Sequence, residues 1–116
     1  MPDTERDGGL LPSTLLVVDA VVEPSVESEW NEWYYRKHLP EILACPHFQS
    51  GARYVCNAEG ARNYLTIYAL ASEEAIRTPE FAKARGWGPF KEKVRYATRL
   101  YTRLNAPVSE SKSHER

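Results

Sequence analysis

The chain has 116 residues, which is the size of a single domain with one hydrophobic core. Its 42% hydrophobic and 27% charged residues exclude a disordered or fibrous protein. A formal net charge of −1 gives no overall attraction to nucleic acids or to anionic membranes, so we expect neither as a partner.

Both ends of the chain lack hydrophobic periodicity. Residues 1–13 and 105–116 are predicted to be disordered tails that flank one domain over residues 14–104. The domain begins with "STLLVVDAVVE", a β-branched segment that predicts a well-buried strand. A helix should follow, capped by Ser25 or Ser28 and running to about Ala44.

The second half of the domain predicts a hairpin, a helical region and a last strand. The alternating segments "FQSGARYVCN" and "RNYLTIYALA", joined by the turn "AEGA", predict the hairpin. The helical region begins with Ser72 as its cap, restarts at Pro79 and ends in "GWGP". The segment "KVRYATRLYTRL", rich in Tyr and Thr, predicts the last strand.

The order βαββαβ predicts an α+β fold, a ferredoxin-like sandwich. Its four-stranded antiparallel sheet should have the order 4-1-3-2, with both helices on one face. On the third strand we expect the aliphatic positions to face the helices and the polar ones to face away, namely Leu65, Ile67 and Ala69 against Tyr64, Thr66 and Tyr68. The first strand is apolar on both faces, which predicts a second copy of the chain as the other cover.

Two cysteines, Cys45 and Cys56, occur without an apolar signal segment, which favours reduced thiols in a cytoplasmic protein. The longest apolar stretch, "TLLVVDAVV", is too short to cross a bilayer. The spacing of His38, Cys45 and His47 matches no zinc pattern, so no metal is expected. The basic face of the last strand is better explained as a solvated sheet edge than as a nucleic-acid site.

The segments "WNEWYYRKHLPEILACP", "FQSGARY" and "RNYLTIYALAS" resemble the dimeric α+β barrel superfamily, and within it the EthD-like group. There, an aromatic pair and a His-x-Pro step on a helix lead through a turn to an Arg-Tyr strand, here Trp33, Tyr34, His38, Pro40, Arg53 and Tyr54. The resemblance implies a homodimer whose two sheets pack into a barrel, with a small-molecule pocket between the sheet and helices of each protomer. The family's turn reads Pro-Gly, whereas this chain has Pro46-His47, which leaves the shape of that turn open.

Members of this superfamily include lactone isomerases, polyketide cyclases, cofactor-free monooxygenases and haem-degrading enzymes. The resemblance implies an enzyme without a cofactor that performs isomerase, cyclase or lyase proton transfer on a compact aromatic or lactone-like substrate. Two alternatives stay open. One is a non-catalytic ligand-binding or accessory protein, and the other is an EthD-like or haem-related monooxygenase, for which His38 would be the axial ligand.

His38 is the first candidate for chemistry. Helical spacing places Trp30, Tyr34 and His38 on nearly one face, and Pro40 should bend or break the helix beside them. His38 is then either the acid/base group of a pocket or a helix-end histidine that is hydrogen-bonded to a backbone carbonyl.

The other candidates are tyrosines, a carboxylate and aromatic wall residues. Tyr54 and Tyr68 could each donate a hydroxyl to the pocket or simply pack. Asp19 lies within "LLVVDAVV" and is either an ion-pair partner of Arg99 or a carboxylic acid with a raised pKa. The predicted catalytic residues are His38, Tyr54, Tyr68 and Asp19, and the predicted substrate-binding residues are Trp30, Trp33, Tyr34, Arg53 and Trp87.

Overall fold

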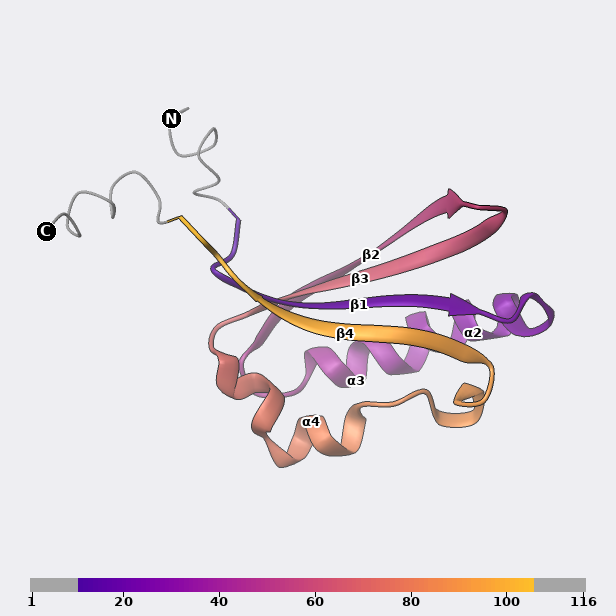
Figure 1. The fold of residues 1–116 in the computed structure, drawn as a ribbon. Helices are drawn as coiled ribbons and strands as arrows, with labels where there is room; N and C mark the ends of the chain where they lie inside the picture. Colours follow the sequence, from indigo (N-terminus) through magenta and orange to yellow (C-terminus); the bar gives the residue numbers. More distant parts are fainter. Residues whose placement is uncertain (1–10, 106–116) are drawn as a thin grey trace, which may run out of the picture.

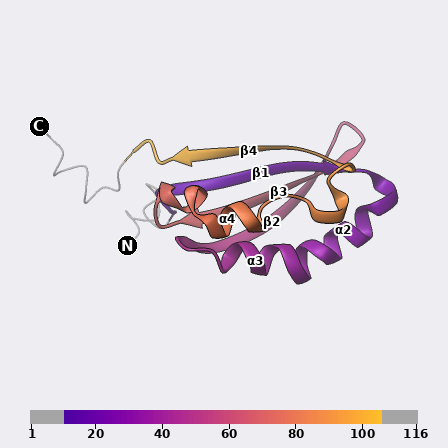
Figure 2. The ribbon, with the colours of Figure 1, turned by 90° about the horizontal axis from the view of Figure 1, so that it is seen from below.

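The computed structural model describes residues 11–105, which form a four-stranded antiparallel sheet with all helices on one face (Figures 1 and 2). The strands are β1 (Thr14–Val22), β2 (Phe48–Ala58), β3 (Ala61–Leu70) and β4 (Val94–Thr102). Their order is β2-β3-β1-β4, so the predicted ferredoxin-like topology is confirmed. Most of the expected tails lies outside the described residues. Within that range, no helix is long and apolar enough to span a membrane.

The first helical segment begins differently from the prediction. Neither Ser25 nor Ser28 provides a side-chain cap, because a 3₁₀ turn (Pro24–Val26) leads directly into α2 (Glu27–Trp33). A single π-helical turn (Tyr34–His38) then joins α2 to α3 (Leu39–Leu43). The three pieces form one continuous helical segment along the sheet (Figure 1).

Pro40 does not break the helix. The amide N–H of Leu39 donates to the carbonyl of Tyr34, five residues earlier, which is the hydrogen bond of a π turn. Pro40 therefore follows directly after the π turn, in the first turn of α3, a position where proline is tolerated. The expected bend is replaced by this widened turn, which contains His38.

The two short turns around β2 both use left-handed backbone. Glu59 and Gly60 have φ values of 53° and 78° and join β2 to β3 as the two-residue loop of the predicted hairpin. His47, which follows Pro46, has φ 73°. A non-glycine residue thus adopts the left-handed conformation here, which leads the chain from α3 into β2.

The second half of the helical layer is short and irregular. A 3₁₀ segment (Glu73–Arg77) is capped by the Ser72 hydroxyl, as predicted, and α4 (Pro79–Ala84) is capped by Thr78. A further 3₁₀ turn (Gly88–Phe90) then leads back to β4.

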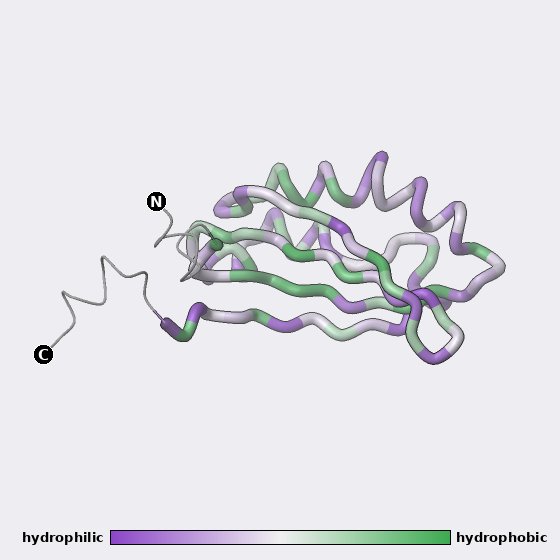
Figure 3. The backbone as a smooth tube through the Cα atoms, turned by 90° about the horizontal axis from the view of Figure 1, so that it is seen from above, coloured by the Kyte–Doolittle hydropathy of each residue, from purple (hydrophilic) through white to green (hydrophobic). Residues whose placement is uncertain are grey.

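The predicted orientation of β3 is wrong. Its even-numbered residues face the helices and are buried, namely Tyr64, Thr66, Tyr68 and Leu70, while Leu65, Ile67 and Ala69 lie half-buried on the opposite face. The polar atoms of the inner face are accommodated because the Tyr34 hydroxyl of the helical layer donates to Thr66. The apolar stretches of the chain follow the central strands (Figure 3). Cys45 and Cys56 are free thiols, as expected.

Candidate active site

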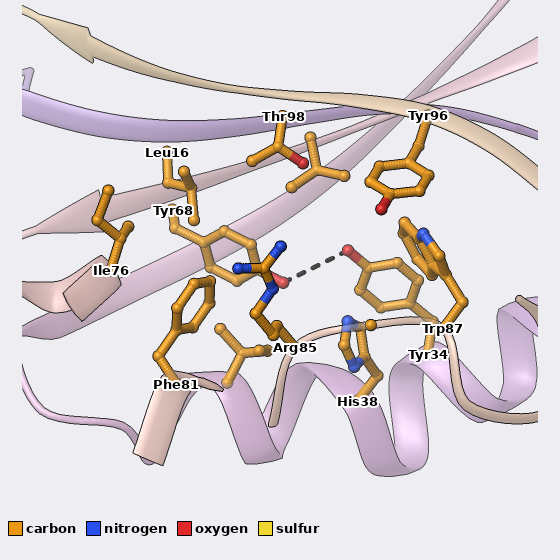
Figure 4. Close-up of a pocket in the computed structure, with 13 residues that line it drawn as sticks. Leu16, Tyr34, His38, Tyr68, Ile76, Phe81, Arg85, Trp87, Tyr96 and Thr98 are labelled. Carbon is orange, nitrogen blue, oxygen red and sulfur yellow. Dashed lines mark hydrogen bonds between the residues drawn. The ribbon is translucent and has the colours of Figure 1, made fainter. Parts of the chain in front are cut away.

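A cavity of about 270 Å³ lies between the inner face of the sheet and the helical layer (Figure 4). Both halves of the hydrophobic core contribute to it, because Leu16, Tyr68 and Phe81 belong to one buried cluster and Tyr34 and Trp87 to the other. The lining residues are Leu16, Val18, Tyr34, His38, Ile42, Tyr68, Ile76, Phe81, Arg85, Gly86, Trp87, Tyr96 and Thr98. The cavity is therefore walled mainly by apolar and aromatic side chains, with a few polar groups among them.

His38 faces this cavity from the π turn and is almost fully buried, with 6% of its surface exposed. Its ring stacks on Trp33 at a centroid distance of 4.7 Å and meets the ring of Tyr34 edge-on at 4.8 Å. Neither ring nitrogen forms a hydrogen bond with another residue in the range 11–105. The hydrogen bond to a backbone carbonyl that a purely structural histidine would make is therefore not formed within these residues. The imidazole is available to a ligand.

Burial keeps His38 neutral at physiological pH. Desolvation lowers the pKa of its imidazole to about 4, against an opposing effect of Glu41 and with a further lowering by the Arg53 cation. A neutral imidazole can accept a proton. His38 therefore has the protonation state that a general base requires.

Two buried tyrosines lie beside His38. The Tyr34 hydroxyl donates to Oγ1 of Thr66 at 2.9 Å, and the two tyrosine oxygens are 3.4 Å apart (Figure 4). Because the Tyr34 proton is used by Thr66, the Tyr68 hydroxyl is the one free to donate toward Tyr34 or toward a ligand. Desolvation, with a smaller effect of Tyr34, raises the pKa of Tyr68 well above its usual value. Tyr68 is therefore a stable hydrogen-bond donor.

Arg53 does not line the cavity, although it was predicted to bind substrate. Its guanidinium lies behind Tyr34, 4.1 Å from the centre of that ring, and 5.1 Å from the centre of Trp30. Nη2 donates to Oδ1 of Asn31 at 2.9 Å. Arg53 thus holds the outer side of the Tyr34 ring while the inner side faces the cavity, a position from which it can support the site without touching a ligand.

The structure brings together about half of the predicted site residues. His38, Tyr34, Tyr68 and Trp87 line the cavity. Trp33 supports His38 by stacking, and Trp30 is fully buried behind Tyr34, 5.9 Å from the ring of Trp87. These last two tryptophans position the lining residues and do not face the cavity themselves.

Tyr54 and Asp19 lie on the opposite face of the sheet. Tyr54 pairs with Leu65 and is 55% exposed, and Asp19 is exposed on β1. The predicted ion pair of Asp19 with Arg99 is not formed within the described residues, because the strand register places Asp19 opposite Ala97. The odd-numbered positions of β1 face away from the helices, so neither Asp19 nor Tyr54 can reach the cavity.

Sequence reasoning missed three polar residues of the cavity. Tyr96 and Thr98 on β4 pair with Ala20 and Val18, so strand register places their side chains on the inner face. The alternation of β4 could have predicted this placement, but only if the inner face of β1 had been known. Arg85 ends α4 and gave no sequence signal of its own.

Comparison with known proteins places this chain in a family. Residues 13–111 match the family described as "Domain of unknown function (DUF4286)". The chain belongs to this family. Comparison with curated protein sequences gives no match.

Solved structures share the fold of this DUF4286 protein. SnoaB, a cofactor-independent oxygenase from Streptomyces nogalater, is 15% identical with a TM-score of 0.60, covering 80% of this chain and 94% of SnoaB. An EthD family protein from Bacillus halodurans C-125 is 10% identical with a TM-score of 0.61, covering 78% and 99%. An antibiotic biosynthesis monooxygenase is 11% identical with a TM-score of 0.60, covering 79% and 99%. The DUF4286 chain therefore has the protomer fold of EthD and antibiotic biosynthesis monooxygenase proteins, the dimeric α+β barrel fold that the sequence resemblance implied.

Proposed function

We propose that this protein is a cofactor-independent oxygenase that acts on a compact, electron-rich aromatic compound. The observation that carries the proposal is a neutral imidazole without a hydrogen-bond partner among residues 11–105. It faces an aromatic cavity beside a tyrosine pair that can donate to an oxyanion. The fold shared with SnoaB, described as a cofactor-independent oxygenase, supports oxygenation over other proton-transfer chemistry.

The reaction would begin with proton transfer to His38. The imidazole takes a proton from a phenolic O–H or from an acidic C–H of the substrate, and the Tyr68 hydroxyl donates to the oxygen on which negative charge develops. The resulting anion is electron-rich and gives electrons to dioxygen, which is the oxidant. A C–O bond forms at the ring carbon, and the O–O bond of the peroxide breaks.

The atoms balance as one CH₂ plus O₂ giving one C=O plus water. One oxygen atom stays on the substrate, and the other leaves as water with the two protons that the carbon has lost. The His38 imidazolium returns its proton to the leaving oxygen, which restores the neutral base.

The cavity limits the size and type of the substrate. At about 270 Å³ it lies just below the ~300–1,000 Å³ usual for ligand pockets, which favours a molecule of one or two fused rings. Phe81, Trp87 and Tyr96 offer ring faces and edges for stacking. A haem macrocycle exceeds this space, and the ring of His38 is held against Trp33, which disfavours the haem alternative.

Proton transfer to His38 would also begin an isomerisation, cyclisation or lyase reaction, the first function predicted from the sequence. Dioxygen consumption separates these possibilities. An oxygenase consumes one O₂ for each molecule of a 1,4-dihydroxynaphthalene or 1-naphthol probe that is converted, whereas an isomerase, cyclase or lyase converts its substrate without oxygen.

The decisive experiment measures oxygen uptake and quinone absorbance with these two probes. Replacing His38 by Ala should lower turnover about 10²–10⁴-fold with probe binding retained, since that is the usual contribution of a positioned acid/base group. His47→Ala is the matched control, because His47 is exposed on the turn after α3. Turnover per folded molecule that is unchanged in His38→Ala would contradict the role of His38. Binding of both probes without oxygen uptake would contradict the oxygenase function and favour a non-catalytic ligand-binding protein.

A further inference from the structure

We propose that the substrate of this cavity carries a carboxylate, and that Arg85 binds it at the cavity mouth. This inference rests on the proposed function, because it concerns the same cavity, and it names a substrate class that neither the fold nor the chemistry of His38 requires. Three observations support it, namely the charges in the cavity wall, the lack of an ion pair of Arg85 within the described residues, and the direction of its side chain.

Arg85 is the one charged side chain among the residues that line the cavity. The lining residues include no carboxylate, and His38 is neutral because burial lowers its pKa to about 4. The remaining polar groups are hydroxyls of tyrosine and threonine. The cavity thus presents a single positive charge with no negative charge in its wall, which favours an anionic ligand.

Arg85 has no carboxylate partner among the described residues. Within residues 11–105 it forms no ion pair, whereas Arg77, on the same connection between β3 and β4, pairs with Glu74 at 3.0 Å. Arg36 and Arg62 pair with glutamates as well. An arginine without a carboxylate partner beside an aromatic cavity keeps all of its fork of donors available to a ligand.

The local backbone directs the guanidinium to the cavity. The amide of Arg85 donates to the carbonyl of Phe81 at 2.9 Å as α4 ends, and Gly86 follows with φ 104°, a conformation that favours glycine. The guanidinium carbon lies 5.9 Å from the centre of the Phe81 ring. Figure 4 shows the guanidinium pointing from the helical layer into the space between Phe81 and His38.

A planar anion fits this arrangement best. A guanidinium forms two parallel hydrogen bonds with a carboxylate, and such charge-assisted bonds are about twice as strong as neutral ones. An aromatic ring bearing the carboxylate could then stack on the aromatic wall, with its reacting carbon toward His38 and Tyr68. A carboxylate near His38 would also oppose the lowering of the His38 pKa and so strengthen this base in the complex.

The test compares two probes of nearly the same shape, 2-naphthoate and its neutral analogue 2-naphthamide. Dissociation constants are measured at pH 7 by tryptophan fluorescence, since Trp87 lines the cavity, and are checked by calorimetry. The wild-type protein should bind 2-naphthoate at least about tenfold more tightly than 2-naphthamide. High salt should weaken this preference, because the cavity mouth is open to solvent.

The variants assign the preference to Arg85. In Arg85→Gln the affinity for 2-naphthoate should fall about tenfold or more while that for 2-naphthamide stays the same, and Arg85→Lys should retain part of the preference. Arg77→Gln is the matched control and should change neither affinity. Equal binding of the two probes by the wild-type protein, an equal loss for both in Arg85→Gln, or no binding of either probe would each overturn the proposal.

The outcome is separate from that of the oxygenase test. A preference for 2-naphthoate that depends on Arg85 would stand even if no oxygen is consumed, and the oxygenase assignment alone would then fall. Oxygen uptake with neutral quinols, combined with no preference for the anionic probe, would support the oxygenase function and contradict the proposal that the substrate carries a carboxylate.

Discussion

The burial that keeps His38 neutral should also make the stability of the protein depend on pH. The pKa of His38 is about 4 in the folded state and about 6.5 in an unfolded chain, so the unfolded state binds more protons between these values. The contribution of neutral His38 to the free energy of unfolding is therefore fully present above pH 6.5 and decreases as the pH falls toward 4. The total loss is about 3 kcal/mol, because each pKa unit corresponds to about 1.4 kcal/mol.

Urea unfolding at a series of pH values from 4 to 7.5 measures this effect. His38→Gln should remove most of the pH dependence between 4 and 6.5, whereas the control His47→Gln should keep it, since His47 is exposed. A wild-type protein whose stability is flat over this range would contradict the buried, neutral state of His38.

At His47 the backbone conformation, and not the imidazole ring, is expected to affect stability. Its φ of 73° costs a residue with a Cβ about 1–2 kcal/mol, and glycine avoids this cost but loses about 0.5–1 kcal/mol of chain entropy. His47→Gly should therefore raise the free energy of unfolding by about 0.5–1 kcal/mol. His47→Ala keeps the strained backbone and should give no such gain, so the difference between the two variants in chemical denaturation is the measurement.

The sequence predicted site residues well where they share a helix with an aromatic pattern. Tyr34 and His38 reach the cavity as expected, because helical spacing fixes which side chains share a face. Asp19 and Tyr54 were predicted as site residues but lie on the face of the sheet opposite the cavity. Arg85 could not be found, because a lone arginine at the end of a short helix has the same pattern whether it faces solvent or a cavity.

At the scale of elements, the π turn is what gives the site its shape. The sequence predicted that Pro40 bends or breaks the helix, whereas in the structure the helix continues and a π turn lies immediately before Pro40. A proline cannot supply the N–H that an unbroken α-helix needs, and here the preceding turn widens by one residue so that the helix continues. His38 is the last residue of that widened turn, and Tyr34 is the first.

Strand alternation defined two faces of the sheet but not which one meets the helices. The two faces of β1 and β3 are both largely apolar, so hydrophobicity alone could not orient them. The face that meets the helices is the one whose hydroxyl groups find hydrogen-bond partners in the helical layer. Tyr34 from the helical layer bonds to Thr66, which satisfies polar atoms that would otherwise be buried without a partner.

The close contact of β2 with β3 makes Gly51 a sensitive position. A Cβ at residue 51 would lie 2.9 Å from Cδ1 of Tyr68 and 3.3 Å from Cδ2 of Leu43, and both must shift to make room. Gly51→Ala should therefore lower stability by about 1–3 kcal/mol, the usual cost of overpacking, and should displace the Tyr68 ring toward the cavity. A crystal structure of the variant and its urea unfolding measure the two effects.

Ser50→Ala is the control for this substitution, because Ser50 is exposed on the same strand and points to the outer face. Its stability should match the wild type within about 0.5 kcal/mol. If Gly51→Ala is as stable as Ser50→Ala and binds the naphthalene probes normally, Tyr68 has more freedom than the packing indicates.

At the scale of the whole molecule, the topology followed from the order of the elements. Short connections and right-handed crossovers leave few arrangements for βαββαβ, and the observed strand order is the predicted one. The outer face of the sheet is not covered by any helix or strand within residues 11–105. Its apolar residues include Leu15, Val17, Val21, Leu65 and Ile67.

We therefore expect two protomers to pack through these outer faces, as the sequence resemblance implies. The half-buried apolar residues of β1 and β3 form the centre of the face, and Tyr54 and Tyr101 are 55% and 47% exposed toward its sides. A patch of this kind on a protomer of 116 residues is unusual in monomers and marks an interaction surface. Sedimentation and light scattering at micromolar concentration should give the mass of a dimer.

Val17→Asp tests which face is used, because Val17 lies on β1 between Ile67 and Arg99 at the middle of the outer face. A buried carboxylate there should shift the protein to monomers, since an unpaired charge in an apolar interface costs several kcal/mol. Val55→Asp is the matched control, because Val55 is half exposed on the helix-side face of β2. The cavity lies on the side of the helices, so the Val17→Asp monomer should still bind the naphthalene probes. A dimer that survives Val17→Asp but not Val55→Asp would place the interface on the other side of the sheet.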